Sequence, residues 1–113
     1  MDYHELIKSI RELLNNLINR SDDIADTYRS LQYEEANERL SYFCEDTVTL
    51  VEGIVVLVED YPSLNAEELE ENIQLVYEGM KNKDYMMIAD LLQHELKYLL
   101  IDWEKVFADE QVQ

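Results

Sequence analysis

The sequence has few of the residues that break or bend a chain. Its 113 residues include two glycines and one proline. A β-rich domain needs turn residues about every 8–12 positions, so this scarcity disfavours sheets and favours helices joined by short turns. Cys44 is the single cysteine. It excludes a disulfide within the chain and is typical of a reducing compartment.

Basic residues are also scarce. The sequence has 9 Lys and Arg against 26 Asp and Glu, a formal net charge of −17. Such a surface repels phosphate backbones and anionic lipid headgroups, which argues against direct binding to nucleic acid or to a membrane. It suits a solubilising coat, a docking surface for a basic protein partner, or a mimic of nucleic acid.

A secretory leader and a long apolar run are both lacking. Acidic residues appear at Asp2 and Glu5, where a leader would be basic and then apolar. The longest apolar run, residues 54–58, is too short to span a bilayer. We therefore expect a cytoplasmic protein that forms a single domain over residues 1–113.

What the sequence does have is apolar residues in steps of three and four, the period of an amphipathic helix. These stripes predict an all-α protein, a four-helix bundle made of two helical hairpins. The predicted helices span residues about 3–30, 33–60, 66–81 and 84–107. The first two are long, and thin hairpins of that length gain from pairing with another copy, so we expect a homodimer.

The first two helices each contain a segment with an alternative interpretation. Ser21 could be the N-cap of a new helix, whereas the unbroken apolar phase predicts one helix over residues 3–30. Residues 54–58 are apolar on all sides, which predicts a helical segment buried on all sides or, alternatively, a strand. Gly53 just before them would let a neighbouring backbone come close or, alternatively, is a mildly destabilising glycine without a role.

The starts of the last two helices carry capping signals. Asn65 and Asp84 are good N-caps, and Lys81 stands near the negative end of the third helix. The joints before the second and fourth helices also resemble each other. Tyr33 and Tyr85 each open a helix, and a leucine follows seven residues later. This predicts either a helical-hairpin repeat or a chance similarity between two joints.

The fourth predicted helix has a second apolar line, away from its main face when projected at about 100° per residue. One interpretation is a central helix with neighbours on two sides, and another is a dimer seam or partner-binding interface. A third is a scatter of exposed apolar residues without a role. The candidate interface residues are Met87, Leu91, His94, Tyr98 and Ile101. We expect His94 to pack its ring at a surface, with pH sensing or metal binding beside Asp90 as the alternative.

Glu95 projects to the edge of the main apolar stripe of the same helix. If it is buried it needs a partner, because burying a carboxylate alone is expensive. The candidate partners are a tyrosine hydroxyl or an arginine such as Arg11, Arg20, Arg29 or Arg39. The alternative is an edge glutamate that reaches water.

The sequence lacks the motifs of common catalytic and metal sites. Neither His4 nor His94 has a glutamate three residues before it, as di-metal carboxylate bundles require. There is no glycine-rich phosphate loop. Cys44 lies beside an apolar stripe and is typical of a packing residue rather than a nucleophile. We expect no enzyme activity, no catalytic, metal-binding or cofactor-binding residues, and no cofactor.

The segment KDYMMIADLLQHELKYLLIDW, residues 83–103, resembles part of small uncharacterised all-helical proteins of Gram-positive bacteria. Those proteins share an aspartate–aromatic start, then Ala-Asp-Leu-Leu or Ala-Asp-Ile-Leu, then Glu-Leu. The matching residues here are Asp84, Tyr85, Ala89, Asp90, Leu91, Leu92, Glu95 and Leu96. The resemblance covers only part of the chain. It implies a bacterial cytoplasmic helical protein and transfers no activity or functional residue.

These observations leave the function open between three hypotheses. The one we favour is a non-enzymatic protein–protein interaction module, such as an adaptor, a chaperone-like protein or an anti-regulator. The second is an enzyme or small-ligand binder with a pocket lined by glutamates and tyrosines near Glu95. The third is a nucleic-acid mimic, which requires acidic side chains spaced like phosphates on one face.

Overall fold

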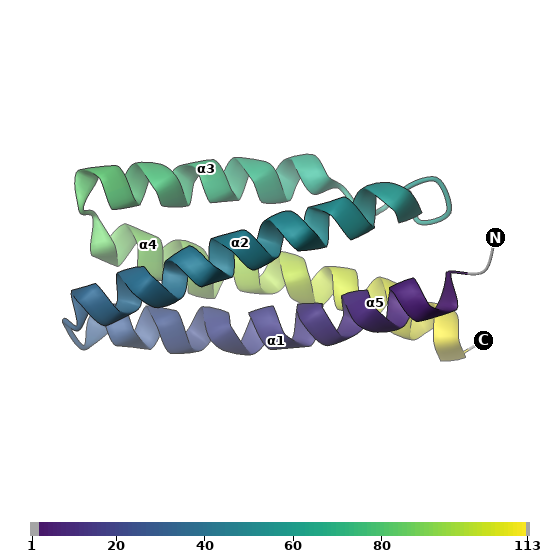
Figure 1. Ribbon diagram of the computed structural model, residues 1–113, viewed down its shortest axis with the longest axis horizontal. Coiled ribbons are helices and arrows are strands. Elements are labelled where there is room, and N and C mark those ends of the chain that lie inside the picture. The colour runs from purple at the N-terminus through teal and green to yellow at the C-terminus, as the bar shows by residue number, and fades with distance from the viewer. Residues whose placement is uncertain (1–2, 113) are drawn as a thin grey trace.

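Helices lying along one long axis make up the protein, as Figure 1 shows. The computed structural model describes the backbone of residues 3–112 and the side chains of residues 3–108. The elements are α1 (His4–Arg29), α2 (Tyr33–Leu57), α3 (Ala66–Asn82), α4 (Tyr85–Leu91), the π-helical turn η1 (Leu92–Leu96) and α5 (Lys97–Val112). Because α4, η1 and α5 are continuous, we call them together the last helix. The predicted all-α, four-helix bundle is confirmed.

α1 is one continuous helix, as its unbroken apolar phase predicts, and Ser21 is not an N-cap. The Ser21 hydroxyl instead donates a hydrogen bond of 2.9 Å to the carbonyl of Leu17 within the helix. Since Ser21 is fully buried, this bond satisfies a hydroxyl that would otherwise be costly to bury. The buried face of α1 holds Ile10, Leu14, Leu17, Ser21, Ile24, Ala25, Thr27 and Tyr28.

Two turns of the same kind end α1 and α3. Leu31 and Lys83 have positive φ angles of 64° and 56°, in the left-handed region that most residues avoid. In each turn, the amide of this residue and the amide of the next donate to carbonyls in the last turn of the preceding helix. This is the Schellman arrangement, usually built on glycine. The similarity predicted between the two joints is therefore present in their backbones.

The two joints also touch each other. The rings of Tyr33 and Tyr85 stack with their centroids 4.2 Å apart, and the ring of Tyr28 lies 5.5 Å from that of Tyr85. The Tyr28 hydroxyl donates to Asn37 Oδ1 at 2.6 Å. Burial raises the pKa of Tyr28 well above its ordinary value, so the phenol stays protonated. The tyrosines thus join one end of the first hairpin to the same end of the second.

The end of α2 differs from the prediction. The helix ends at Leu57, before residue 60, and the apolar run there is not buried on all sides. Ile54 and Leu57 are fully buried, but Val55, Val56 and Val58 are 59%, 51% and 40% exposed. The strand alternative is also wrong, because the run is helical. The reason is that α2 packs mainly on α1 and α3, and its remaining side has no cover in the described part of the chain.

The predicted N-caps of the last two helices are confirmed. The Asn65 side chain accepts a hydrogen bond from the amide of Glu67 at 3.0 Å, and Asp84 accepts one from the amide of Met87 at 3.2 Å. Each bond satisfies an amide that the helix leaves without a partner. α3 and α4 pack on each other as the two arms of one hairpin.

The last helix contains a turn of π-helix, in which the backbone bonds span five residues instead of four. The buried residues explain it. Ile88, Leu92, Leu96 and Leu100 follow one another in steps of four, longer than the 3.6 residues of a regular turn. In a regular helix each step of four turns the series by about 40°, about 120° over the three steps, and one wide turn reduces this drift. Leu100, which a regular projection places at the edge of the main face, is fully buried.

The packing places α1 between two neighbours. It lies against α2 on one side and along α4, η1 and α5 on another, while α3 packs on α2 and α4. Ion pairs of Arg11 with Glu104 at 2.7 Å and Arg29 with Asp90 at 2.8 Å join α1 to the last helix. Among the described residues, no helix combines the length and the apolarity that crossing a bilayer requires.

Both glycines lie where a helix is approached closely by a side chain. A Cβ on Gly53 would be 2.9 Å from Ile10 Cδ1, so the neighbour that comes close is a side chain of α1. The prediction that a backbone comes close to Gly53 is therefore wrong. A Cβ on Gly79 would be 2.7 Å from Ile88 Cγ1. Gly79 therefore lets α3 pack closely on α4.

Candidate functional site

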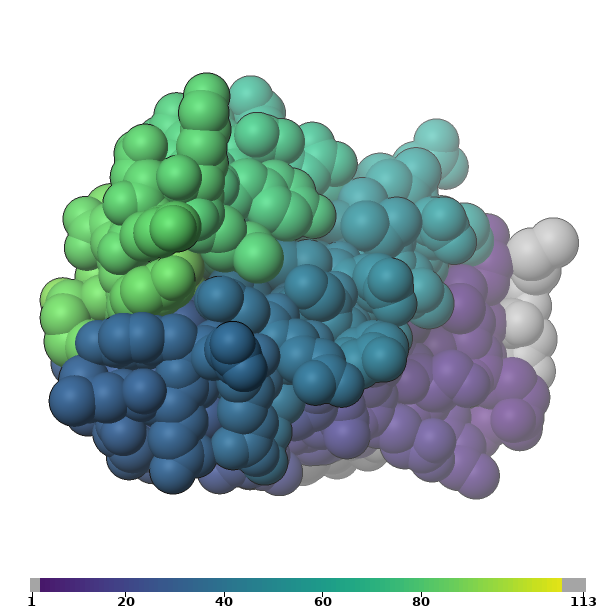
Figure 2. Space-filling model, turned by 60° about the vertical axis from the view of Figure 1, so that its left-hand side comes forward, coloured from purple at the N-terminus to yellow at the C-terminus, as the bar shows by residue number. Residues whose placement is uncertain are grey.

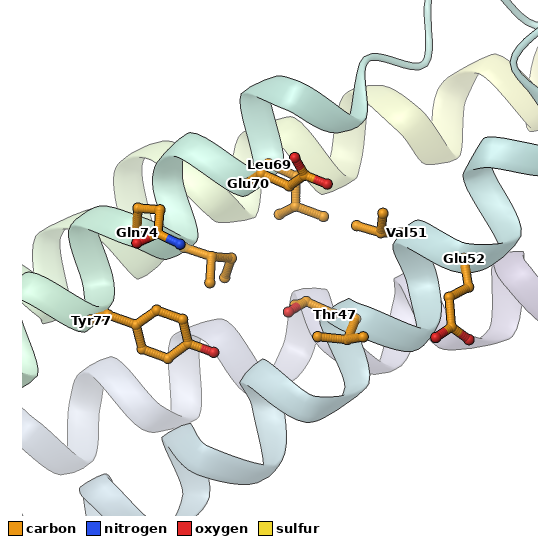
Figure 3. Close-up of a pocket in the computed structure, with 9 residues that line it drawn as sticks. Thr47, Val51, Glu52, Leu69, Glu70, Gln74 and Tyr77 are labelled. Carbon is orange, nitrogen blue, oxygen red and sulfur yellow. The ribbon is translucent and has the colours of Figure 1, made fainter.

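A half-open groove of about 250 Å³ lies between α2 and α3. In Figure 2, α3 in green meets α2 in blue to teal along a line that crosses this face of the molecule. Figure 3 shows Leu69 and Val51 facing each other from the two helices, and the ring of Tyr77 projecting from α3 toward α2. The groove is lined by Thr47, Val48, Val51, Glu52, Leu69, Glu70, Ile73, Gln74 and Tyr77.

A second depression of about 240 Å³ continues the groove toward the start of α2. It shares Val48 and Tyr77 with the first and adds Ser41, Cys44, Glu45 and Met80. Interaction with the neighbouring Tyr77 hydroxyl lowers the pKa of the Cys44 thiol. Burial nevertheless raises the pKa of Cys44 to about 11. The thiol is therefore protonated at neutral pH and is a packing group of the groove floor, as its sequence position predicts.

The apolar floor continues beyond the groove as a row of valines along α2 and its C-cap residue, Val58. Val48, Val51, Val55 and Val58 follow one another in steps of three and four, so they lie on one side of the helix. Val48, Val55 and Val58 are 55%, 59% and 40% exposed, and Val51 is partly buried. We call these four residues the valine stripe. It joins the groove to the end of α2 as one apolar surface.

The charged residues that line the two depressions are all acidic. Glu45, Glu52 and Glu70 line the two depressions, and all three are exposed. Neither depression is lined by a lysine or an arginine. Together with the formal net charge of −17, these carboxylates surround an apolar floor with negative potential.

The interface predicted on the last helix is divided by η1. Met87 and Leu91 come before the wide turn and are partly buried. Met87 Cε lies 3.0 Å from the position of a Cβ on Gly79, so α3 covers this part of the line. The other members are His94 and Tyr98, which are exposed, and Ile101, which is partly buried. An interface over these five residues stays a prediction.

Glu95 is exposed, so a buried carboxylate at this position is ruled out. It lies within η1, between the buried Leu92 and Leu96. The four arginines considered as partners of Glu95 form ion pairs with other carboxylates. Arg11 pairs with Glu104, Arg20 with Asp46, Arg29 with Asp90 and Arg39 with Glu35. A groove with glutamates and a tyrosine does exist, but it lies between α2 and α3, and Glu95 does not line it.

The groove offers a surface rather than reactive groups. Within residues 3–108, no three His, Cys, Asp or Glu side chains are grouped so that they could hold a metal ion. In the same part of the chain, every buried side-chain nitrogen or oxygen has a hydrogen-bond partner. No orphaned polar atom therefore marks a site for a small ligand there.

Sequence reasoning missed the valine stripe, although its spacing is visible in the sequence. The apolar run at the end of α2 led to the prediction that these valines are buried, because a helix apolar on all sides is usually buried on all sides. Helix propensity is the signal that could have found it. Valine is a weak helix former, so valines spaced along one side of a helix need packing to explain them.

The match to a family covers the whole of this site. A family model described as a domain of unknown function (DUF8042) matches residues 5–106, which include the groove and the valine stripe. No curated protein and no solved structure matches the chain. The function must therefore be argued from the geometry of the groove.

Proposed function

The chain belongs to the family described as a domain of unknown function (DUF8042), and we propose that it is a non-enzymatic module that binds another protein along α2 and α3. The observation that carries this proposal is the valine stripe. It is an apolar surface that runs out of a groove and along a helix, with acidic residues at its edge. Contiguous exposed apolar surface with a polar rim is typical of a protein interaction site.

Within this chain alone, the exposed valines lower the stability of the helix and gain little free energy from burial. In a helix, valine is less favourable than alanine by up to about 0.7 kcal/mol, and a side chain left in water gains nothing from burial. Covering a half-exposed valine would contribute roughly 1 kcal/mol, since full burial of such a side chain is worth about 1.5–3 kcal/mol. A partner that covers Val48, Val55 and Val58 would bury these side chains, and their burial would contribute to the free energy of binding.

The other two hypotheses have less support. A small ligand is usually enclosed over most of its surface, whereas this groove is half-open and continues into an exposed stripe. A nucleic-acid mimic would carry its carboxylates as an array like a phosphate backbone. Here Glu45, Glu52 and Glu70 flank apolar side chains instead, which is the arrangement of a protein interface.

Photo-crosslinking from single positions in the native host tests this proposal. We would place benzoylphenylalanine at Val55, which is 59% exposed on the valine stripe, and at Leu75, which is 44% exposed on α3 and lines neither depression. The expected result is a discrete protein adduct from position 55 and none from position 75. Equal adducts from both positions, or no adduct from position 55, would refute the proposal. Thermal unfolding of both variants checks that the fold is intact.

The source and location of the protein are also part of the proposal. A cytoplasmic protein of a Gram-positive bacterium is supported by the lone Cys44 and by the resemblance of residues 83–103 to helical proteins of such bacteria. Fractionation of the native host with an antibody to the chain would test the location. Recovery outside the cytoplasmic fraction would contradict it.

A further inference from the structure

Resting on the proposed function, we infer that the partner presents an amphipathic helix that carries lysine or arginine beside its apolar stripe. The inference combines the shape of the docking surface, the spacing of its apolar residues and the sign of its rim charges.

The shape fits a helix laid along α2. The two depressions and the valine stripe extend along α2 from Ser41 to Val58, and at about 1.5 Å per residue this is roughly 26 Å. The two depressions have volumes of about 250 and 240 Å³. Each is larger than a cavity of about 150 Å³, which can hold a benzene molecule. Apolar side chains of a partner could therefore enter both.

The spacing of the apolar residues also favours a helix as the partner. The valines recur in steps of three and four, which forms a ridge along α2, and a second helix packs against such a ridge with its own residues at the same spacing. An extended peptide would instead need an open strand edge for its backbone, and residues 3–112 contain no strand.

The charges favour a basic helix. Glu45, Glu52 and Glu70 line the depressions, and no lysine or arginine joins them there. A second copy of this chain would bring its own three glutamates to the same rim, and like charges across an interface are costly. A helix with lysine or arginine beside its apolar stripe instead places opposite charges at the rim, where they also speed association.

A selection from displayed helices tests this inference. The library consists of amphipathic helices of about 18 residues, long enough to follow α2 over the docking surface, with an apolar stripe and flanking positions randomised among Lys, Glu, Gln and Ser. The bait is the full chain. The counter-selection uses the variant with Val48→Gln and Val55→Gln, which has the same charge and alters only exposed positions. We expect the helices that discriminate between the two to carry Lys more often than Glu by about tenfold, the ratio that 1.4 kcal/mol produces.

Substitutions at the rim provide the second measurement. Replacing Glu45, Glu52 and Glu70 by glutamine should weaken binding of the selected helices about tenfold, because each substitution removes one exposed ion pair at the rim. The matched control removes the same charge at exposed glutamates that line neither depression: Glu5, Glu12 and Glu34. The control should change affinity far less.

The outcomes separate this inference from the proposed function. If the selected helices need the valines but are neutral or acidic, the basic partner is refuted while the docking surface stands. If no helix discriminates the wild type from the valine variant, the helical partner is refuted, and the crosslink from position 55 decides the docking surface separately. If the wild type is a dimer in solution and the valine variant is a monomer, the occupant is a second copy and the inference is overturned.

Discussion

Replacing Gly79 by alanine tests how closely α3 packs on the last helix. A Cβ at Gly79 would lie 2.7 Å from Ile88 Cγ1 and 3.0 Å from Met87 Cε. Ile88 is fully buried, and its branched side chain has little freedom to turn aside within a helix. Alanine should gain about 0.8–1 kcal/mol of helix propensity and lose about 1–3 kcal/mol to overpacking. We therefore expect the free energy of unfolding to fall by about 1 kcal/mol.

The other glycine provides the matched control. A Cβ at Gly53 would meet Ile10 Cδ1, the movable end of the side chain, at 2.9 Å, and Ile10 Cγ1 at 3.1 Å, which is 0.4 Å farther than Ile88 Cγ1 is from Gly79. Gly53→Ala should therefore keep most of its gain in helix propensity and raise the free energy of unfolding by up to about 1 kcal/mol. Urea unfolding followed by circular dichroism measures both variants, and the two substitutions should have opposite signs.

A double-mutant cycle decides whether Ile88 is the cause. Ile88→Ala removes Cγ1 and should itself cost about 2–5 kcal/mol. In that background the overpacking is relieved, so Gly79→Ala should become neutral or stabilising. If Gly79→Ala destabilises the protein equally in both backgrounds, the close approach to Ile88 is not the reason and the argument is refuted.

Three further predictions concern the turns, the buried thiol and one ion pair. Leu31→Gly and Lys83→Gly should each raise the free energy of unfolding by about 0.5–1 kcal/mol in urea, because glycine removes a left-handed penalty of about 1–2 kcal/mol and costs about 0.5–1 kcal/mol of chain entropy; no gain in either would contradict the prediction. Burial raises the pKa of Cys44 from 9.0 to about 11, so stability that is present below pH 9.0 should be lost as the pH rises toward 11. The loss should reach about 2–3 kcal/mol and be smaller in Cys44→Ala, and equal losses in both proteins would refute the assignment. Arg11→Gln should cost about 1 kcal/mol by breaking the two bonds to Glu104 at 2.7 and 3.0 Å, and a coupling near zero in a cycle with Glu104→Gln would contradict it.

The helices and their starts could be predicted from local patterns. Periodic apolar residues identified the helices, and Asn65 and Asp84 marked two of the starts, because a cap bonds to amides only two or three residues away. The unbroken phase through Ser21 also predicted one long first helix. The wide turn of η1 had a signal in the series Ile88, Leu92, Leu96 and Leu100, whose steps of four exceed a regular turn.

The sequence by itself determined the helices, the acidic coat and the similarity of the two joints, since each depends on neighbouring residues or on composition. Only the tertiary structure decided which helix sides are covered. Val55 and Leu57 are both apolar and both lie in α2, yet one is 59% exposed and the other fully buried. Glu95 is exposed, although it lies in η1 between the buried Leu92 and Leu96. Burial depends on which segments arrive from elsewhere in the chain, and no local pattern contains that information.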